Sequence, residues 1–434
     1  MKGLLTFPDK EHVIQKAYFF CLLFVAVSLF SPGRDLTNLA VILLASVWVF
    51  EGKFSEKYHR LRANLVTIPF FILFLLYLIG VFYTEDIRAG FKSLETKAPL
   101  LVFPLVLGSA SIKIENLKKV LLYFAIACVL CSLVALIYQS FVVLKKNDFN
   151  YFFSDGLVSI MQKRAVYYAI YVATSILILV NYLFSSFKGI ATKQKVLTVA
   201  GIVFLLLILF LLATRASLIA LLLILIITLV AAGIRYGKLK YSVILIALLF
   251  AFIATLSVVF PQTIARFKSL HNVTYDFSNT EEVYHFSGAD SDTKWNGLNL
   301  RLAKWVCAFD LIKEHPLFGV GTGDVKNEMV EAYKRRNFTY AAQHRFDPHN
   351  QYLSTTVGLG IPALFILLAC FLYPLYLAKQ RKSWLLASFT LLIMFCALTE
   401  SLLGSAQGII FICFFLFLLL QSTATEKILN NSNF

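Results

Sequence analysis

Charged residues are scarce in this chain. They make up 15% of its 434 residues, whereas they account for about a quarter of an ordinary soluble domain. Hydrophobic residues make up 59%, and the mean hydropathy is +0.76. Apolar runs of about 20 residues recur, each long enough to cross a hydrocarbon core of about 30 Å, while the short alternating segments of a membrane β-barrel are missing. The composition excludes a soluble globule and predicts an all-α polytopic membrane protein.

Metal-binding and disulfide patterns are also missing. Six of the seven cysteines lie in apolar runs, which favours a packing role over a disulfide framework. His344, Asp347 and His349 are candidate metal ligands, but no HExxH motif or repeated Cys/His spacing supports a metal site there. The run from Gly319 to Gly323 lacks the preceding strand and the following GKS/T of a phosphate-binding loop, so it predicts a tight turn. We expect no metal and no cofactor.

Hydropathy indicates about twelve membrane spans. Their approximate cores are 17–31, 36–50, 65–83, 98–110, 120–143, 165–184, 196–213, 216–234, 241–260, 351–378, 383–399 and 403–421. The fourth is interrupted by Pro99 and Pro104 and is an alternative candidate for a re-entrant segment. We therefore divide the chain into helices 1–9 (1–260), one large loop subdomain (261–350), and helices 10–12 with a tail (351–434).

Basic residues orient these spans. If the amino terminus is cytoplasmic, the cytoplasmic tails and loops hold twenty of the 40 lysines and arginines, and the short outer segments hold nine. This bias follows the positive-inside rule, so we expect both termini in the cytoplasm and loop 261–350 in the periplasm. Loop 261–350 itself has as many acidic as basic residues. The net charge of +16 therefore indicates contact with anionic lipid and gives no argument for nucleic-acid binding.

Four polar residues at the outer side are candidates for chemistry. Arg215 and Glu400 lie at predicted span ends, where an ionisable residue is a functional candidate by default; the alternatives are a snorkelling arginine and a structural ion-pair partner. His349 lies where the chain re-enters the membrane and suits a general base, with Asp347 as an orienting group, or else is a hydrogen-bonded loop histidine. Arg301 lies on a predicted amphipathic helix over 298–313 and is alternatively a solvated charge.

Several motifs together resemble the superfamily of O-antigen ligases and O-antigen polymerases. They are Arg301-Leu-Ala-Lys-Trp305, His315-Pro-Leu-Phe-Gly-Val-Gly321, His349-Asn350-Gln-Tyr352-Leu353, the segment Gly358-Leu-Gly360, and Thr214-Arg215-Ala-Ser217. Their order, late in a many-helix chain with one large loop, is what makes the combination specific. Ile361-Pro362 departs from the pattern, because a glycine often stands there.

The resemblance implies a GT-C-like glycosyltransferase of the bacterial inner membrane, with its active site facing the periplasm. A ligase would move a glycan from undecaprenyl diphosphate to a hydroxyl of lipid A–core, whereas a polymerase would extend the carrier-linked glycan. A transporter or flippase is a weaker alternative, because it would need charges at the bilayer midplane. His349, Arg215 and Arg301 would be catalytic in this interpretation. The predicted contacts to diphosphate or sugar are Arg88, Lys92, Lys97, Arg164, Arg336, Arg345 and Tyr352.

Overall fold

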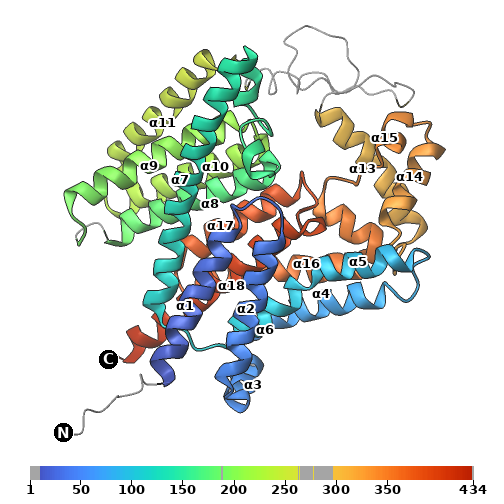
Figure 1. Ribbon diagram of the computed structural model, residues 1–434, viewed down its shortest axis with the longest axis horizontal. Helices are drawn as coiled ribbons and strands as arrows, with labels where there is room; N and C mark the ends of the chain where they lie inside the picture. Colours follow the sequence, from blue (N-terminus) through green and yellow to red (C-terminus); the bar gives the residue numbers. More distant parts are fainter. Residues whose placement is uncertain (1–9, 187–188, 262, 264–276, 278–296, 433–434) are drawn as a thin grey trace.

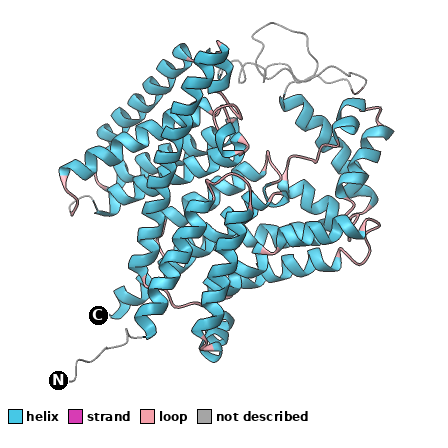
Figure 2. Cartoon of the chain, in the orientation of Figure 1, coloured by secondary structure: helices cyan, strands magenta, loops and turns pink. Residues whose placement is uncertain are grey.

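The structure is a computed structural model, which describes residues 10–186, 189–261, 263, 277 and 297–432. Within these residues the chain forms helices and loops and no strand (Figure 2). The α-helices are α1 (Lys10–Ser28), α2 (Asp35–Glu51), α3 (Phe54–Ala63), α4 (Thr67–Ile79), α5 (Ile87–Lys97), α6 (Pro99–Ser109), α7 (Ile114–Lys146), α8 (Ala165–Ser186), α9 (Thr192–Leu211), α10 (Arg215–Arg235), α11 (Leu239–Val259), α13 (Gly297–Glu314), α14 (Val325–Arg335), α15 (Thr339–His344), α16 (Gln351–Gln380), α17 (Trp384–Ala397) and α18 (Ala406–Ser432). Short 3-10 helices are η1 (Phe149–Phe152), η2 (Ser159–Met161) and η3 (Leu402–Gly404).

All twelve segments predicted as spans are largely helical, which confirms the all-helical membrane fold. Among the described residues, eight helices are long and apolar enough to cross a membrane. The number rises to nine if α2 and α3, which meet at 114°, form one broken span. Helices α4 and α17 are apolar but have only 13 and 14 residues, which at 1.5 Å per residue is shorter than the hydrocarbon core. The count of about twelve spans is therefore not confirmed.

The last long helix, α18, forms the centre of the bundle. It contacts α6, α7 and α17 (Figure 1), and its apolar side chains from Ile409 to Leu420 are buried all round. Phe415 packs at 4.5 Å from Phe124 of α7 and at 6.2 Å from Phe389 of α17, measured between ring centroids. A helix that is apolar on every face is expected at such a central position.

Helices α13, α14 and α15 have a separate apolar core. They lie together at one side of the molecule (Figure 1), and Cys307, Leu311, Met329 and Tyr333 are buried between them. The predicted amphipathic helix over 298–313 is confirmed as α13, which ends at Glu314 as expected from the following His-Pro pair. This group belongs to loop 261–350, of which residues 262, 264–276 and 278–296 lie outside the described residues.

Glycines join this outer group to the membrane helices. Val320 N donates to Val357 O at 2.8 Å, so the predicted turn 319–323 lies directly against α16. Gly360 has a φ of +80° and kinks α16 there, and a Cβ at this position would overlap with Leu317 O. Gly319 has a φ of +65°, and a Cβ there would overlap with the same stretch of α16 backbone. The close approach of the two backbones thus explains the glycines of both motifs.

The loop before α5 is fixed to the same turn. The Asp324 carboxylate accepts hydrogen bonds from Glu85 N at 2.6 Å and from Asp86 N at 2.9 Å. Tyr83 OH donates to Phe318 O at 2.5 Å. Helix α5, the turn and the kinked start of α16 therefore form one connected scaffold.

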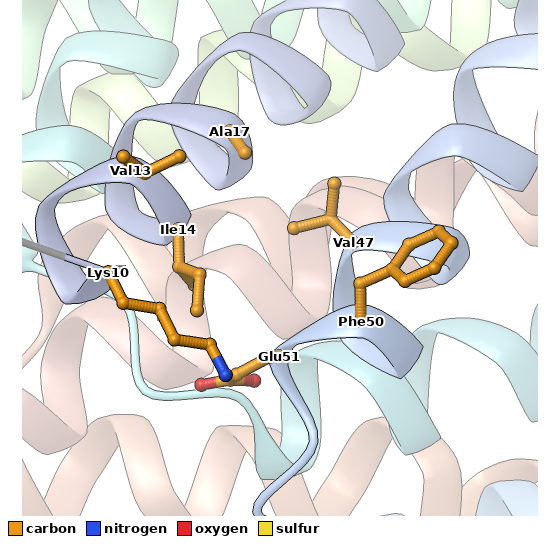
Figure 3. A pocket seen from close by; sticks show the side chains of 7 residues that line it. All are labelled: Lys10, Val13, Ile14, Ala17, Val47, Phe50 and Glu51. Carbon is orange, nitrogen blue, oxygen red and sulfur yellow. The ribbon is translucent and has the colours of Figure 1, made fainter. Parts of the chain in front are cut away.

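An apolar cleft of about 490 Å³ lies between α1 and α2 (Figure 3). Lys10 and Glu51 point toward each other at its floor (Figure 3). The Glu51 carboxylate accepts hydrogen bonds from Tyr18 OH at 2.6 Å and from Lys57 Nζ at 2.7 Å, and both Glu51 and Lys57 are buried. This closed ion pair fixes the bend between α2 and α3.

Candidate functional site

The Glu400 carboxylate joins two of the predicted catalytic residues. Its Oε1 lies 3.2 Å from Arg301 Nη2, and its Oε2 lies 3.1 Å from His349 Nδ1. Burial alone would raise the pKa of Glu400, but the hydrogen bond and charge of His349 and the charges of Arg301 and Lys304 outweigh it, so this pKa falls below its ordinary value. Glu400 is therefore ionised at neutral pH and accepts hydrogen bonds from both partners.

The ionised carboxylate favours the tautomer of His349 that carries the hydrogen on Nδ1, while Asp347 Oδ1 lies farther away, 3.4 Å from Nε2. A carboxylate accepts only, so the His349 nitrogen that faces it, Nδ1, carries the hydrogen. In the neutral ring, Nε2 then carries the lone pair. Orientation of an imidazole by a carboxylate in this way is the arrangement found in base-assisted nucleophilic catalysis.

A tight turn presents His349. Its φ is +47°, in the left-handed region, and its backbone N donates to Asp347 Oδ1 at 3.1 Å. Asn350 caps α16 by accepting from Leu353 N at 3.1 Å, so the helix begins immediately after the histidine. A non-glycine residue in this region costs free energy and is retained where the surroundings fix it, as at many active sites. The cap and the aspartate fix it here.

Helix α13 holds this turn from the other side. Trp305 Nε1 donates to Pro348 O at 3.1 Å, and Lys304 Nζ lies 4.9 Å from the centroid of the Phe346 ring. One turn earlier, Arg301 donates through Nη1 to Gly297 O at 3.1 Å and through Nε to Thr399 O at 3.2 Å. A single helix therefore fixes both the histidine turn and the segment that carries Glu400.

The segment after Glu400 is held by α16 and α5. Leu403 N donates to Gln351 Oε1 at 2.6 Å, and Leu403 O accepts from Lys97 Nζ at 2.6 Å. Lys97 is buried, and burial lowers its pKa to about 8. Tyr352 OH donates to Met394 O at 3.0 Å on α17. Lys97 and Tyr352, both predicted to contact substrate, thus make internal contacts here.

Arg215 is the first residue of α10. The Ser217 and Cys396 side chains lie 3.5 Å apart, so the start of α10 lies beside the end of α17, four residues before Glu400. Arg215 is half-buried. Because Arg215 begins this helix, the backbone N–H groups of the first turn also favour an anion there.

The remaining predicted contacts lie on the surface. Arg88 and Lys92 are exposed on α5, one turn apart, and Arg164 is exposed just before α8. Arg336 forms an ion pair with an aspartate of α13 at 2.6 Å, and Arg345 donates to an asparagine of α14 at 2.6 Å. Their role as substrate contacts stays a prediction.

The roles of two residues in this cluster, Glu400 and Lys304, were not predicted from the sequence. Glu400 was recognised as a candidate, but not as the common partner of Arg301 and His349, because 99 and 51 residues separate it from them. Lys304 was missed, although its position three residues after Arg301 places both on one helix face. No group of three His, Cys, Asp or Glu side chains suited to a metal occurs in the described part of the chain.

Comparison with known protein families matches one segment of the chain. A family model described as O-Antigen ligase matches residues 200–368, which include Arg215, Arg301 and His349 and end before Glu400. A comparison with curated proteins finds no match. Together with the apolar helices, the matched segment indicates a multi-pass membrane enzyme of the ligase and polymerase type. Residues 200–368 of this chain are therefore similar to the O-antigen ligase family, in agreement with the resemblance of the motifs.

Proposed function

We propose that this protein is an O-antigen ligase that transfers a glycan from undecaprenyl diphosphate to a hydroxyl of lipid A–core. The reaction takes place at the periplasmic face of the bacterial inner membrane, with both termini in the cytoplasm. The observation that carries this proposal is the Glu400 carboxylate between Arg301 and His349. It combines an oriented base and a cation at the outer end of apolar helices, where a lipid-linked donor presents its diphosphate.

The proposed step uses His349 as the base. The acceptor hydroxyl gives its proton to Nε2 as its oxygen bonds to the anomeric carbon of the donor sugar. The bond from that carbon to the diphosphate oxygen breaks, and its electron pair leaves with undecaprenyl diphosphate. Glu400 balances the imidazolium that forms, which supports proton transfer of the kind that contributes about 10²–10⁴-fold in rate.

The leaving diphosphate needs positive charge. Arg301 has a side chain that is 31% exposed, and Arg215 starts a helix beside the same span ends. Fixed cations near the developing charge are usually a large part of transition-state stabilisation, and a guanidinium binds phosphate oxygens through paired hydrogen bonds. We assign Arg301 and Arg215 to the diphosphate, with Arg88, Lys92, Arg164, Arg336 and Arg345 as further candidates along its approach.

Reconstitution tests the proposal directly. Purified protein in vesicles receives undecaprenyl-diphosphate glycan and lipid A–core, and the products are separated on gels. A ligase moves glycan to lipid A–core in the presence of EDTA, and His349→Ala and Arg215→Ala lose this transfer. Longer carrier-linked glycan with unchanged lipid A–core would identify a polymerase instead, since the donor chemistry is shared.

Matched controls separate chemistry from folding. His315→Ala removes an exposed histidine that follows α13, and Arg335→Ala removes an exposed surface ion pair with Glu314. Both variants should retain transfer. If His349→Ala and Arg215→Ala also retained it, the site assignment would be wrong for either reaction.

A further inference from the structure

The ammonium group of Lys304 has no ionic partner among the described residues. The residue is 2% exposed, and its Nζ contacts the face of the Phe346 ring. Over the described residues it makes no hydrogen bond, and no carboxylate lies within ion-pair distance of it. A cation–π contact replaces only part of the hydration that a buried ammonium loses. Lys304 is therefore a cation with no carboxylate in direct contact among the described residues, although the charges of Asp347 and Glu400 act on it.

Asp347 occupies the position that the acceptor needs. Its Oδ1 lies 3.4 Å from His349 Nε2, the nitrogen that carries the lone pair in the proposed mechanism. A base must lie about 2.6–3.2 Å from the oxygen whose proton it takes, so an acceptor oxygen would compete with this carboxylate for the same side of the ring. The Asp347 side chain is 39% exposed and is held by one hydrogen bond, from His349 N. It is therefore displaceable.

We propose that Lys304 is a positioning residue that receives the Asp347 carboxylate when the acceptor hydroxyl takes its place at His349. This inference rests on the proposed function and adds a regulated step to it. Phe346, which contacts the Lys304 ammonium, is the chain neighbour of Asp347, and the charge of Asp347 already acts on Lys304. Arg301, the nearest other cation of α13 in the chain, already donates to three acceptors.

The charges around Lys304 favour an interaction between its ammonium group and the Asp347 carboxylate. Burial and the charge of Arg301 lower the pKa of Lys304 to about 7, while Asp347 and Glu400 oppose this shift. The His344 ring stacks on Phe346 at 5.3 Å, and the His349 ring lies 6.1 Å away from it, so two imidazoles face the same aromatic ring. A carboxylate that moves to Lys304 stabilises its protonated form and relieves the cost of burying the charge.

The test measures acceptor dependence in the reconstituted transfer reaction. Lys304→Met leaves Asp347 with no cation to move to, so the acceptor competes with it. The KM for lipid A–core should rise roughly tenfold, because a charge-assisted contact in the acceptor-bound state is lost. The KM for the donor should stay within about twofold. Lys304→Arg keeps the charge and should return the acceptor KM toward its native value, and Lys304→Gln replaces the Met variant if that one does not fold.

A double-mutant cycle with Asp347→Ala separates this role from a structural one. Without the competing carboxylate, Lys304→Met should no longer change the acceptor KM, so the two substitutions are not additive. An equal rise of the acceptor KM in both backgrounds, or no rise in Lys304→Met, would overturn the inference while leaving the transferase assignment intact. Absence of transfer by the native protein would instead refute the proposed function, and this inference with it.

Discussion

Replacement of Glu400 by glutamine is the most direct test of the candidate site. The two carboxylate oxygens accept from two different donors, Oε1 from Arg301 and Oε2 from His349. An amide of the same shape has one oxygen and one NH₂ group, so it can accept from one of these donors and must present a donor to the other. Glu400→Gln therefore keeps the side-chain volume and breaks one arm of the bridge.

The size of the effect follows from the bond that is lost. A hydrogen bond to a charged group contributes about 1.5–3 kcal/mol, which corresponds to roughly 10- to 150-fold in rate if it acts in the transition state. Loss of the His349 arm also lets the ring exchange its tautomer, which moves the hydrogen to Nε2 and removes the base. We expect kcat to fall by at least about tenfold, with the donor KM little changed.

The assay is initial-rate glycan transfer in vesicles at saturating donor and acceptor. Glu331→Gln is the matched control, because Glu331 is 55% exposed and pairs with Lys334 on the surface of α14; it should retain the native rate. A Glu400→Gln variant that turns over within twofold of the native protein would refute the oriented-base mechanism. Native thermal stability of the variant, measured in detergent, shows that the loss is not one of folding.

Three further predictions concern the scaffold. Gly360→Ala should lower the unfolding temperature by several degrees, because it places a Cβ against a backbone carbonyl at a residue with positive φ. Gly237→Ala is the control and should lower it less, because Gly237 has a φ of +64° but no atom within 4 Å of the added Cβ. Asn350→Ala removes a helix cap and should cost about 1 kcal/mol as well as transfer activity, while Ser383→Ala, with a 3.4 Å cap bond on α17, should affect stability alone. Lys304→Met should be more stable than the native protein at pH 6, and this difference should shrink toward pH 10. The lowered pKa of the buried lysine destabilises the native protein fully at pH values below about 7. That penalty is lost as the pH rises from there toward the pKa of lysine in the unfolded chain. Thermal unfolding in detergent across pH measures all three.

The helices were predictable because apolar length is a local property. Each predicted span is a run of residues that cannot remain in water, and each proved to be largely helical. The number of crossings was not predictable in the same way. Helices α4 and α17 are too short to span alone, and α2 bends into α3 at 114°, so their relation to the bilayer depends on neighbouring helices and not on composition.

The site was predictable in its parts but not in its connections. Arg301 and His349 stand out because each is a polar residue next to an apolar run, and Glu400 stands out for the same reason. That one carboxylate bridges the other two is a fact of tertiary packing, since α13, the turn before α16 and the end of α17 meet only in the fold. The burial of Lys304 could not be predicted for a related reason. A lysine on an amphipathic helix is normally solvated, and only packing shows that this one is buried.

Two carboxylates at helix ends show what separates a structural charge from a functional one in this protein. The Glu51 carboxylate accepts hydrogen bonds from Tyr18 and Lys57, and the side chains of the Glu51–Lys57 pair are only 2–6% exposed. Glu400 is itself largely covered, but its partners Arg301 and His349 are 31% and 23% exposed.

A buried pair with every bond made stabilises a bend and can do little else. A buried carboxylate that bonds two partly exposed side chains orients both of them, and a substrate can contact those side chains at the surface. The same residue type therefore serves as an anchor between α2 and α3 and as the organising group between α13 and α17, and the exposure of its partners is what distinguishes the two roles.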